Sequence, residues 1–309
     1  MKKLFKKVVI CLTAVFSLAA FSACYKPNTS GQSVLTSFYP VYLITQRITN
    51  GTDIDIQNMA RPQTGCLHDY QLTTLDMRLL NSAQVLIING AGMEHSFIEK
   101  AVGETNINVI DSSEGLFDES GINEEHEEHF HSDEESHDHE HEMNSHLWMS
   151  LDMVSVQAQN ICSGLKEIYP QFSDIIDKNT QLFIDDVNSL KELEKANQTN
   201  DDFNVISFNE AFHYLLEEND AKITAEIEID ENSTPTARQM AQMTDSAKEL
   251  NVKAVFCAND NGRIFAETIG RELNIPVYIL DSLTYTVSSD DYIAAMKNNI
   301  LTISEAKNK

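Results

Sequence analysis

The sequence predicts an α/β protein of two lobes, each with a mostly parallel sheet, joined by one long rigid helix. Short β-rich runs alternate with helical stretches in two halves of the chain, before residue 112 and after residue 199. Such alternation is typical of parallel strands joined by right-handed crossovers. Between the halves, residues 171–197 contain neither proline nor glycine. The length of 309 residues also exceeds that of one average domain.

The first lobe is expected to span residues 33–168. Its strands are predicted from β-rich apolar runs, which are SVLTSF, DIDIQNM, AQVLII and INVID. Helices are expected near residues 40–50, 72–81, 94–102 and 150–168. A loop rich in Glu and His, residues 112–145, interrupts the alternation before the last of these helices.

The linker helix is expected over residues 169–198, because apolar residues recur after Pro170 at steps of three and four or their multiples. The second lobe, residues 199–309, resumes the alternation. Its strands are predicted in FNVISF, KITAEIEI, VKAVFCA and PVYIL. Its helices are predicted in EAFHYLLEE, PTARQMAQMTDSAKEL and RIFAETIGREL, with a final helix from Asp290.

Residues 1–23 are expected to be a lipoprotein signal peptide. Four lysines among the first seven residues precede an apolar stretch that is short for a membrane span. It ends in Phe21-Ser22-Ala23-Cys24, which resembles a bacterial lipobox with Cys24 as the lipidated residue. Residues 24–32 would then be a polar tether, and the protein would lie on the extracytoplasmic face of the cell membrane. The alternative is ordinary secretion, with cleavage near Ala20 or Ala23.

The charge of the chain excludes some classes of partner. Its formal net charge is −26, and −16 remains when the acidic segment 124–142 is left out. A surface of this sign repels nucleic acid and anionic lipid and attracts cations. We therefore expect no nucleic-acid partner.

Seven of the ten histidines lie in the run of residues 124–146, which also contains ten acidic residues. Imidazole and carboxylate are the side chains that bind borderline divalent ions such as Zn²⁺. This run is predicted to be a flexible accessory metal loop, and the alternative is a solvated acidic loop with incidental histidines. The accessory ligands are His126, His129, His131, His137, His139 and His141.

Three cysteines remain beyond the signal segment and Cys24, namely Cys66, Cys162 and Cys257. Three do not form a disulfide framework in an exported protein, so they are expected to be partly buried thiols.

Three further residues lie where open α/β sheets place ligands. His68 is in a turn between a strand and a helix, His146 precedes a helix, and Asp281 follows the strand PVYIL. Each could equally be a loop residue or a helix cap. His95, in GAGMEHSF, is expected to start a helix at the rim of the cleft.

Several motifs together resemble one family. They are TSFYPVY, the turn around His68, INGAGME, SHLWMSLDM, the AF-x-Y of EAFHYL, AETIGREL and LDSL. In this order they are similar to the metal-binding lipoproteins of bacterial zinc and manganese ABC importers, the cluster A-I solute-binding proteins. The resemblance covers about residues 33–306. It implies one metal ion between two lobes, with His68 and His146 as ligands from the first lobe and Asp281 from the second. It also implies an ABC permease and its ATPase as partners, and we expect a monomer anchored to the membrane by its lipid.

The chain departs from the family pattern at the fourth ligand. Where the family usually has His or Glu, two residues before the Ala of AF-x-Y, this chain has Asn209. An amide oxygen is a weaker ligand for Zn²⁺ than imidazole or carboxylate. His213 lies one helical turn further on and is preferred as the fourth ligand. Asn209 is kept as the alternative, and Glu210 as a third candidate.

Three imidazoles and one carboxylate form a closed four-coordinate shell without a position for an activated water. The sequence also lacks HExxH, a Gly-x-Ser-x-Gly elbow and a Walker loop. We therefore expect a Zn²⁺-capturing binding protein and no enzyme. The alternatives are a receptor for Mn²⁺ or Fe²⁺, a metal-storage lipoprotein, and an open-site metalloenzyme.

Overall fold

The computed structural model describes residues 32–60, 70–103, 105, 107–117, 144–199, 202–227, 235–258, 262–284 and 291–309. The residues from Gln32 onward belong to one compact unit. Among the described residues, no helix is both long and apolar enough to cross a membrane.

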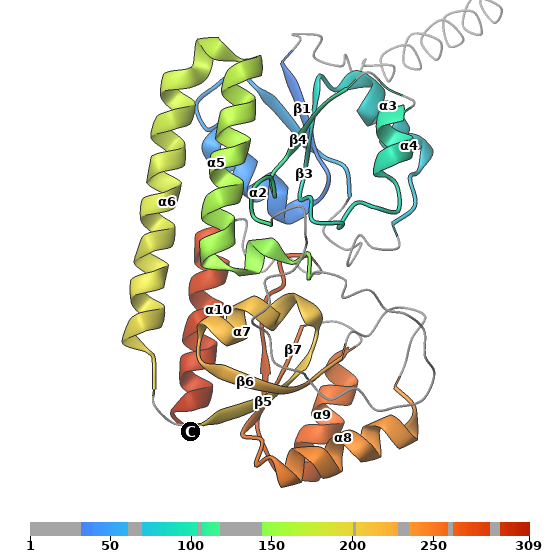
Figure 1. Cartoon of the computed structure of the whole chain (residues 1–309), viewed down its shortest axis with the longest axis vertical. Coiled ribbons are helices and arrows are strands. Elements are labelled where there is room, and N and C mark those ends of the chain that lie inside the picture. The colour runs from blue at the N-terminus through green and yellow to red at the C-terminus, as the bar shows by residue number, and fades with distance from the viewer. Residues whose placement is uncertain are drawn as a thin grey trace, which may run out of the picture. The chain divides into compact units, whose positions relative to one another are not determined.

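The first sheet has four parallel strands in the order β2-β1-β3-β4. Figure 1 labels three of them, β1, β3 and β4. Its middle strand β3 reads Val-Leu-Ile-Ile and is buried along its whole length, which is the pattern of a parallel strand covered on both faces. The strands are β1 Ser33–Thr36, β2 Asp55–Asn58, β3 Val85–Ile88 and β4 Asn108–Asp111. The connecting helices are α2 Tyr39–Ile48, α3 Thr74–Ser82 and α4 Ile98–Gly103.

The second sheet repeats this topology, with four parallel strands in the order β6-β5-β7-β8. The strands are β5 Phe203–Phe208, β6 Ala221–Glu226, β7 Ala254–Cys257 and β8 Val277–Ile279. The helices are α7 His213–Glu218, α8 Ala237–Glu249, α9 Gly262–Leu273 and α10 Tyr292–Lys307. Asp291 caps α10, because its Oδ1 accepts hydrogen bonds from the backbone N–H groups of Ile293 and Ala294.

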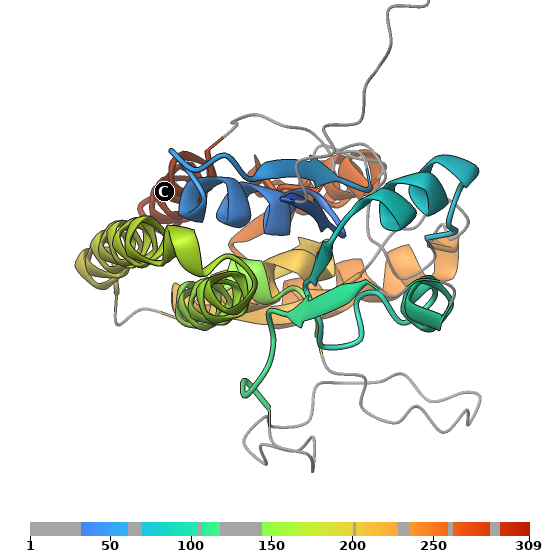
Figure 2. The ribbon, with the colours of Figure 1, turned by 90° about the horizontal axis from the view of Figure 1, so that it is seen from above.

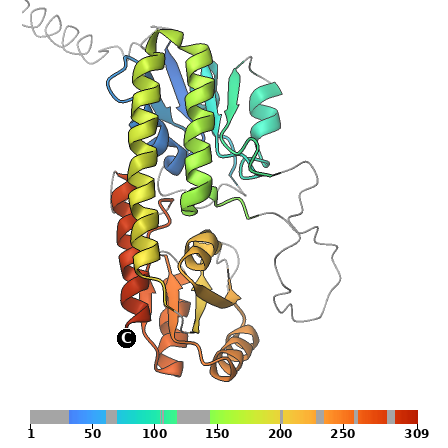
Figure 3. The same ribbon diagram turned by 60° about the vertical axis from the view of Figure 1, so that its left-hand side comes forward.

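Two long helices lie between the sheets in the sequence and pack side by side, as Figure 2 shows. These are α5 Leu151–Ile168 and α6 Ser173–Ala196, joined by a 3₁₀ turn at Pro170–Phe172. α6 contacts α2 of the first half and α10 of the second (Figure 3). Its buried residues recur at steps of three and four, including Ile176, Phe183 and Val187.

The predicted fold class is therefore confirmed: the protein is α/β, with two parallel sheets and a long helix between them in the sequence. The long helix begins three residues later than Pro170, because the proline starts the preceding 3₁₀ turn. The boundaries given for the lobes and the signal peptide remain predictions.

Candidate metal site

The structure describes four of the predicted ligands, His146, Asn209, His213 and Asp281, and also Glu210, the third candidate for the fourth position. The other predicted functional residues lie outside the described part of the chain. They are His68, the accessory histidines His126, His129, His131, His137, His139 and His141, and Cys24 and Cys66.

His146 is buried and lies directly before the 3₁₀ turn η1, Leu147–Met149. All three residues of this turn are fully buried, so they anchor the histidine in the core. The His146 ring lies 5.1 Å from the ring of Trp148. Its Nδ1 is 2.8 Å from Oδ1 of Asn144.

Trp148 joins the segment of His146 to that of Asp281. The indole N–H donates a 3.0 Å hydrogen bond to the carbonyl of Ser282, the residue next to Asp281. The hydroxyl of Tyr292 in turn donates to the Trp148 carbonyl at 2.6 Å. Trp148 therefore fixes the distance between two chain segments that are 134 residues apart in the sequence.

Asp281 is half-buried and follows β8. Its backbone N–H donates to Oδ1 of Asn299, and Nδ2 of Asn299 donates to its carbonyl, each at 2.8 Å. Its carboxylate Oδ1 accepts a hydrogen bond from the backbone N–H of Leu283. Leu283 has a positive φ of 63°, so a tight turn orients the Asp281 carboxylate.

Asn209 follows β5 and is nearly buried. Its side-chain oxygen accepts a 2.9 Å hydrogen bond from the backbone N–H of Ala211 and so caps the 3₁₀ turn Glu210–Phe212. A carbonyl oxygen has two lone pairs. The cap uses one of them.

His213 is the first residue of α7, and both of its ring nitrogens face carboxylates. Nδ1 lies 3.0 Å from Glu226 of β6, and Nε2 lies 3.4 Å from Glu217 of α7. Burial lowers the pKa of His213, but the hydrogen bond and charge of Glu226, together with Glu217 and Glu210, outweigh it, and the pKa is raised. For His213 to bind a metal ion, one of these nitrogens must leave its carboxylate.

Asn144 joins the His146 segment to the segment of Asn209 and His213. Its Nδ2 donates to the Glu210 carbonyl at 3.0 Å. Its own carbonyl accepts a 2.7 Å hydrogen bond from the hydroxyl of Tyr214. Burial raises the pKa of Tyr214 to about 12, so this phenol stays protonated and remains a donor.

The structure thus brings together the segments of His146, Asp281 and residues 209–214. Within the described residues, no group of three or more His, Cys, Asp or Glu side chains is placed to hold a metal ion. His68 lies outside those residues, and His213 is paired with carboxylates. The ligand set therefore stays a prediction.

A buried carboxyl group supports the same region, and its role was not foreseen from the sequence. Glu94 accepts hydrogen bonds from the backbone N–H groups of Asn89 and Gly90, and burial raises its pKa to about 7. Nδ2 of Asn89 donates to the carbonyl of Ser145, the residue before His146. Glu94 belongs to the INGAGME motif, in which Gly90 and Gly92 have positive φ. This pair of glycines was the sequence signal that could have indicated a tight turn beside Glu94.

His95 is exposed and lies in the turn before α4, which begins only at Ile98. The expectation that His95 starts this helix was therefore three residues too early. Cys162 and Cys257 are both buried.

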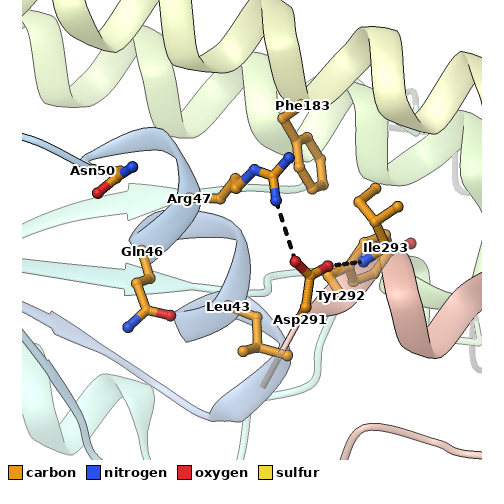
Figure 4. Close-up of a pocket in the computed structure, with 8 residues that line it drawn as sticks. All are labelled: Leu43, Gln46, Arg47, Asn50, Phe183, Asp291, Tyr292 and Ile293. Carbon is orange, nitrogen blue, oxygen red and sulfur yellow. Dashed lines mark hydrogen bonds and ion pairs between the residues drawn. The ribbon is translucent and has the colours of Figure 1, made fainter. Parts of the chain in front are cut away.

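A pocket of about 250 Å³ lies where α2, α6 and the start of α10 meet (Figure 4). Arg47 of α2 pairs there with Asp291 at 3.2 Å, and it also pairs with Asp186 of α6. None of the four described candidate ligands lines this pocket.

Comparison with known proteins gives a family and several relatives. The family model of the periplasmic zinc-uptake complex component A matches residues 34–306. The high-affinity zinc uptake system protein ZnuA of Bacillus subtilis is 26% identical over 308 residues, which cover 94% of this chain and 93% of that protein. The zinc-binding lipoprotein AdcA of Streptococcus pneumoniae is 21% identical over 310 residues, which cover 96% of this chain and 60% of AdcA.

A solved structure supports the fold. The substrate-binding protein FpvC of Pseudomonas aeruginosa, in complex with Mn²⁺, superposes with a TM-score of 0.72 at 21% identity, over 89% of this chain and 97% of that one. FpvC, whose structure was solved with a bound metal ion, therefore shares the fold of this chain.

Proposed function

Because the chain belongs to the family of the periplasmic zinc-uptake component A, a family of metal-binding substrate-binding proteins of ABC transporters, we propose that it captures Zn²⁺ outside the membrane and delivers it to an ABC permease and its ATPase. The family is one of transport proteins and is not an enzyme class. The ion is thus the cargo of the protein.

The observation that carries this proposal is the convergence of three chain segments around His146. Trp148 is hydrogen-bonded to Ser282, beside Asp281, and Asn144 is hydrogen-bonded to Glu210, beside Asn209. Segments from both sheets therefore meet at one buried histidine. We propose that the metal binds there, with His68, His146 and Asp281 as ligands.

For the fourth ligand we propose His213, with Asn209 as the alternative. An imidazole would complete a nitrogen-rich set that suits Zn²⁺. It would have to exchange one contact with Glu226 or Glu217 for the ion. Asn209 would instead supply its amide oxygen, which caps the turn Glu210–Phe212 in the metal-free protein, and this oxygen-richer set would favour Mn²⁺ or Fe²⁺.

We further propose that residues 126–141 are an accessory loop. Weak contacts with two or three of its histidines would raise the local concentration of Zn²⁺. Lipidation of Cys24 would keep this strongly acidic chain at an anionic membrane that would otherwise repel it.

Metal titration of the protein from Cys24 onward, with metal analysis of the bound fraction, tests the proposal. We expect one tight site for Zn²⁺. His68→Ala, His146→Ala and Asp281→Ala should each weaken it by more than the roughly 10–100-fold typical of outer-shell changes. Comparing His213→Ala with Asn209→Ala then identifies the fourth ligand. His95→Ala is the matched control, because this histidine is exposed in a turn and should bind like the wild type.

Deletion of residues 124–142 separates a receptor from a storage protein. A receptor keeps its tight site without these residues, whereas a storage lipoprotein loses nearly all binding. The proposal would be wrong if the deletion abolished tight binding, or if all four ligand variants bound as the wild type does. Hydrolysis of generic ester, amide or phosphate substrates by the Zn²⁺-loaded protein would instead favour the metalloenzyme.

A further inference from the structure

The side chain of Asn144 connects His146 with the chain segment that follows β5. Its Oδ1 lies 2.8 Å from Nδ1 of His146 and also accepts a 3.0 Å hydrogen bond from the His146 backbone N–H. Its Nδ2 lies 3.0 Å from the carbonyl oxygen of Glu210. One amide group thus contacts both sides of the proposed site.

These contacts determine which way the amide points. The Glu210 carbonyl can only accept a hydrogen bond, so it must face the NH₂ group of Asn144. The backbone N–H of His146 can only donate, so it must face the amide oxygen. Two independent partners therefore assign Oδ1 and Nδ2 in the same way.

The orientation of the amide in turn determines the proton on the histidine ring. An amide oxygen only accepts, so Nδ1 of the neutral His146 ring must carry the proton and donate it. Nε2 is then the unprotonated nitrogen of the neutral ring. A metal ion binds the unprotonated ring nitrogen, and an acceptor on the other nitrogen holds the ring in place.

Neighbouring contacts hold Asn144 itself in place. The Tyr214 hydroxyl donates to its carbonyl at 2.7 Å. Nδ2 of Asn89 donates to the carbonyl of the next residue, Ser145, at 2.8 Å. Ser145 and His146 are both buried, so the geometry of this segment is restricted on each side.

We propose that Asn144 is the positioning residue of the metal site: it holds His146 with the proton on Nδ1 and Nε2 presented to Zn²⁺, and ties this ring to the Glu210 segment. The inference rests on the proposed role of His146 as a ligand. Its first part, the tautomer, concerns the metal-free protein and is tested without metal.

Nitrogen NMR of the metal-free protein, with His146→Ala used to assign the signals, provides that test. The neutral His146 ring should show its proton on Nδ1. In Asn144→Ala this form should lose population to the form protonated on Nε2. A wild-type ring protonated on Nε2, or a tautomer ratio that Asn144→Ala leaves unchanged, would overturn the inference whatever the protein binds.

Zn²⁺ affinity, measured by competition with a chelator, provides the second test. Asn144→Ala should lower it about 10–100-fold. Asn144→Asp should bind more tightly than Asn144→Ala, because a carboxylate also accepts the Nδ1 proton. The matched control is Asn160→Ala, which removes two hydrogen bonds from an asparagine to the carbonyls of Ser112 and Glu114 and should leave the affinity unchanged.

The outcomes separate the inference from the proposed function. If His146→Ala abolishes tight binding while Asn144→Ala binds like the wild type, the inference fails and the proposed site stands. If His146→Ala retains tight binding, the proposed ligand set fails. Melting temperatures of all variants show whether a loss of affinity comes from unfolding.

Discussion

The carboxylate of Glu218, at the end of α7, accepts a 3.0 Å hydrogen bond from the backbone N–H of Leu151, the first residue of α5. Its other oxygen accepts from the hydroxyl of Ser150, the N-cap of the same helix. An acidic group at a helix N-terminus satisfies free N–H groups and interacts favourably with the helix dipole. A residue from the second half of the chain therefore caps the helix that follows His146.

We predict that Glu218→Ala lowers the free energy of unfolding by about 1–3 kcal/mol, because it leaves buried donors without an acceptor. Glu218→Gln should cost less, since the amide oxygen still accepts one hydrogen bond. Chemical denaturation of the metal-free protein measures both effects. The control is Glu192→Ala, whose exposed side chain pairs with Lys195 of the same helix and which should change stability by less than about 0.5 kcal/mol. Equal effects of Glu218→Ala and Glu192→Ala would contradict the capping role.

A second prediction concerns pH. Burial raises the pKa of Glu194, on α6, to about 7, above the ordinary value of 4.5. The folded protein thus keeps a proton that the unfolded chain releases, and the stability from this group is complete below pH 4.5 and is lost as the pH rises to about 7. Glu194→Gln keeps an acceptor for Asn219 but cannot titrate. Between pH 5 and pH 8 the variant should therefore lose roughly 1–3 kcal/mol less of its free energy of unfolding than the wild type loses.

Urea denaturation at pH 5 and pH 8, with a chelator present, measures this difference. Glu192→Gln serves as the control, because the Glu192 side chain is 72% exposed. If Glu194→Gln followed the pH dependence of the wild type, Glu194 would not be the group that titrates.

Arg47 provides a third prediction. It pairs with Asp186 of α6 and with Asp291 at the start of α10. All three side chains are 40–47% exposed, so Arg47→Ala should cost only about 1 kcal/mol or less. The cost should decrease further in 1 M NaCl, because salt screens exposed charges. Lys248→Ala, which removes an exposed pair with Asp245 within α8, should cost less. A larger effect of Arg47→Ala at high salt than at low salt would contradict an electrostatic origin.

The fourth prediction concerns the close packing of α5 on β4. A methyl group added at Gly164 would lie 2.7 Å from the side chain of Ile110. Gly164→Ala should therefore destabilise the protein by about 1–3 kcal/mol through overpacking. Ile110→Ala in the same chain should relieve part of this cost, and a double-mutant cycle of melting temperatures measures the coupling. At Gly103 the added methyl group meets no atom of the described residues within 4 Å, so Gly103→Ala is the neutral comparison.

Much of the fold was predictable because it depends on local periodicity. The apolar spacing after Pro170 indicated the long helix, and it forms over Ser173–Ala196. The helix expected over residues 210–218 was only partly correct. Its first turn is a 3₁₀ turn capped by Asn209, and six residues of α-helix follow.

The candidate site was less predictable. The surroundings of His213 depend on β6 lying beside β5, which places Glu226 against the ring. No spacing in the sequence contains this information, since Glu226 is 13 residues away. The contact between Asn144 and Glu210 is likewise long-range, over 66 residues.

The sequence by itself determined the α/β class and the long helix, because hydrophobic periodicity is a local property. It named His146 and Asp281 as candidate ligands only through the resemblance to a family. Only the tertiary structure decided that Trp148 joins the segments of these two residues, that carboxylates surround His213, and that Asn144 orients His146. The physical reason is that hydrogen bonds between distant segments form only after both sheets and the helices between them have packed, and that packing depends on the whole chain.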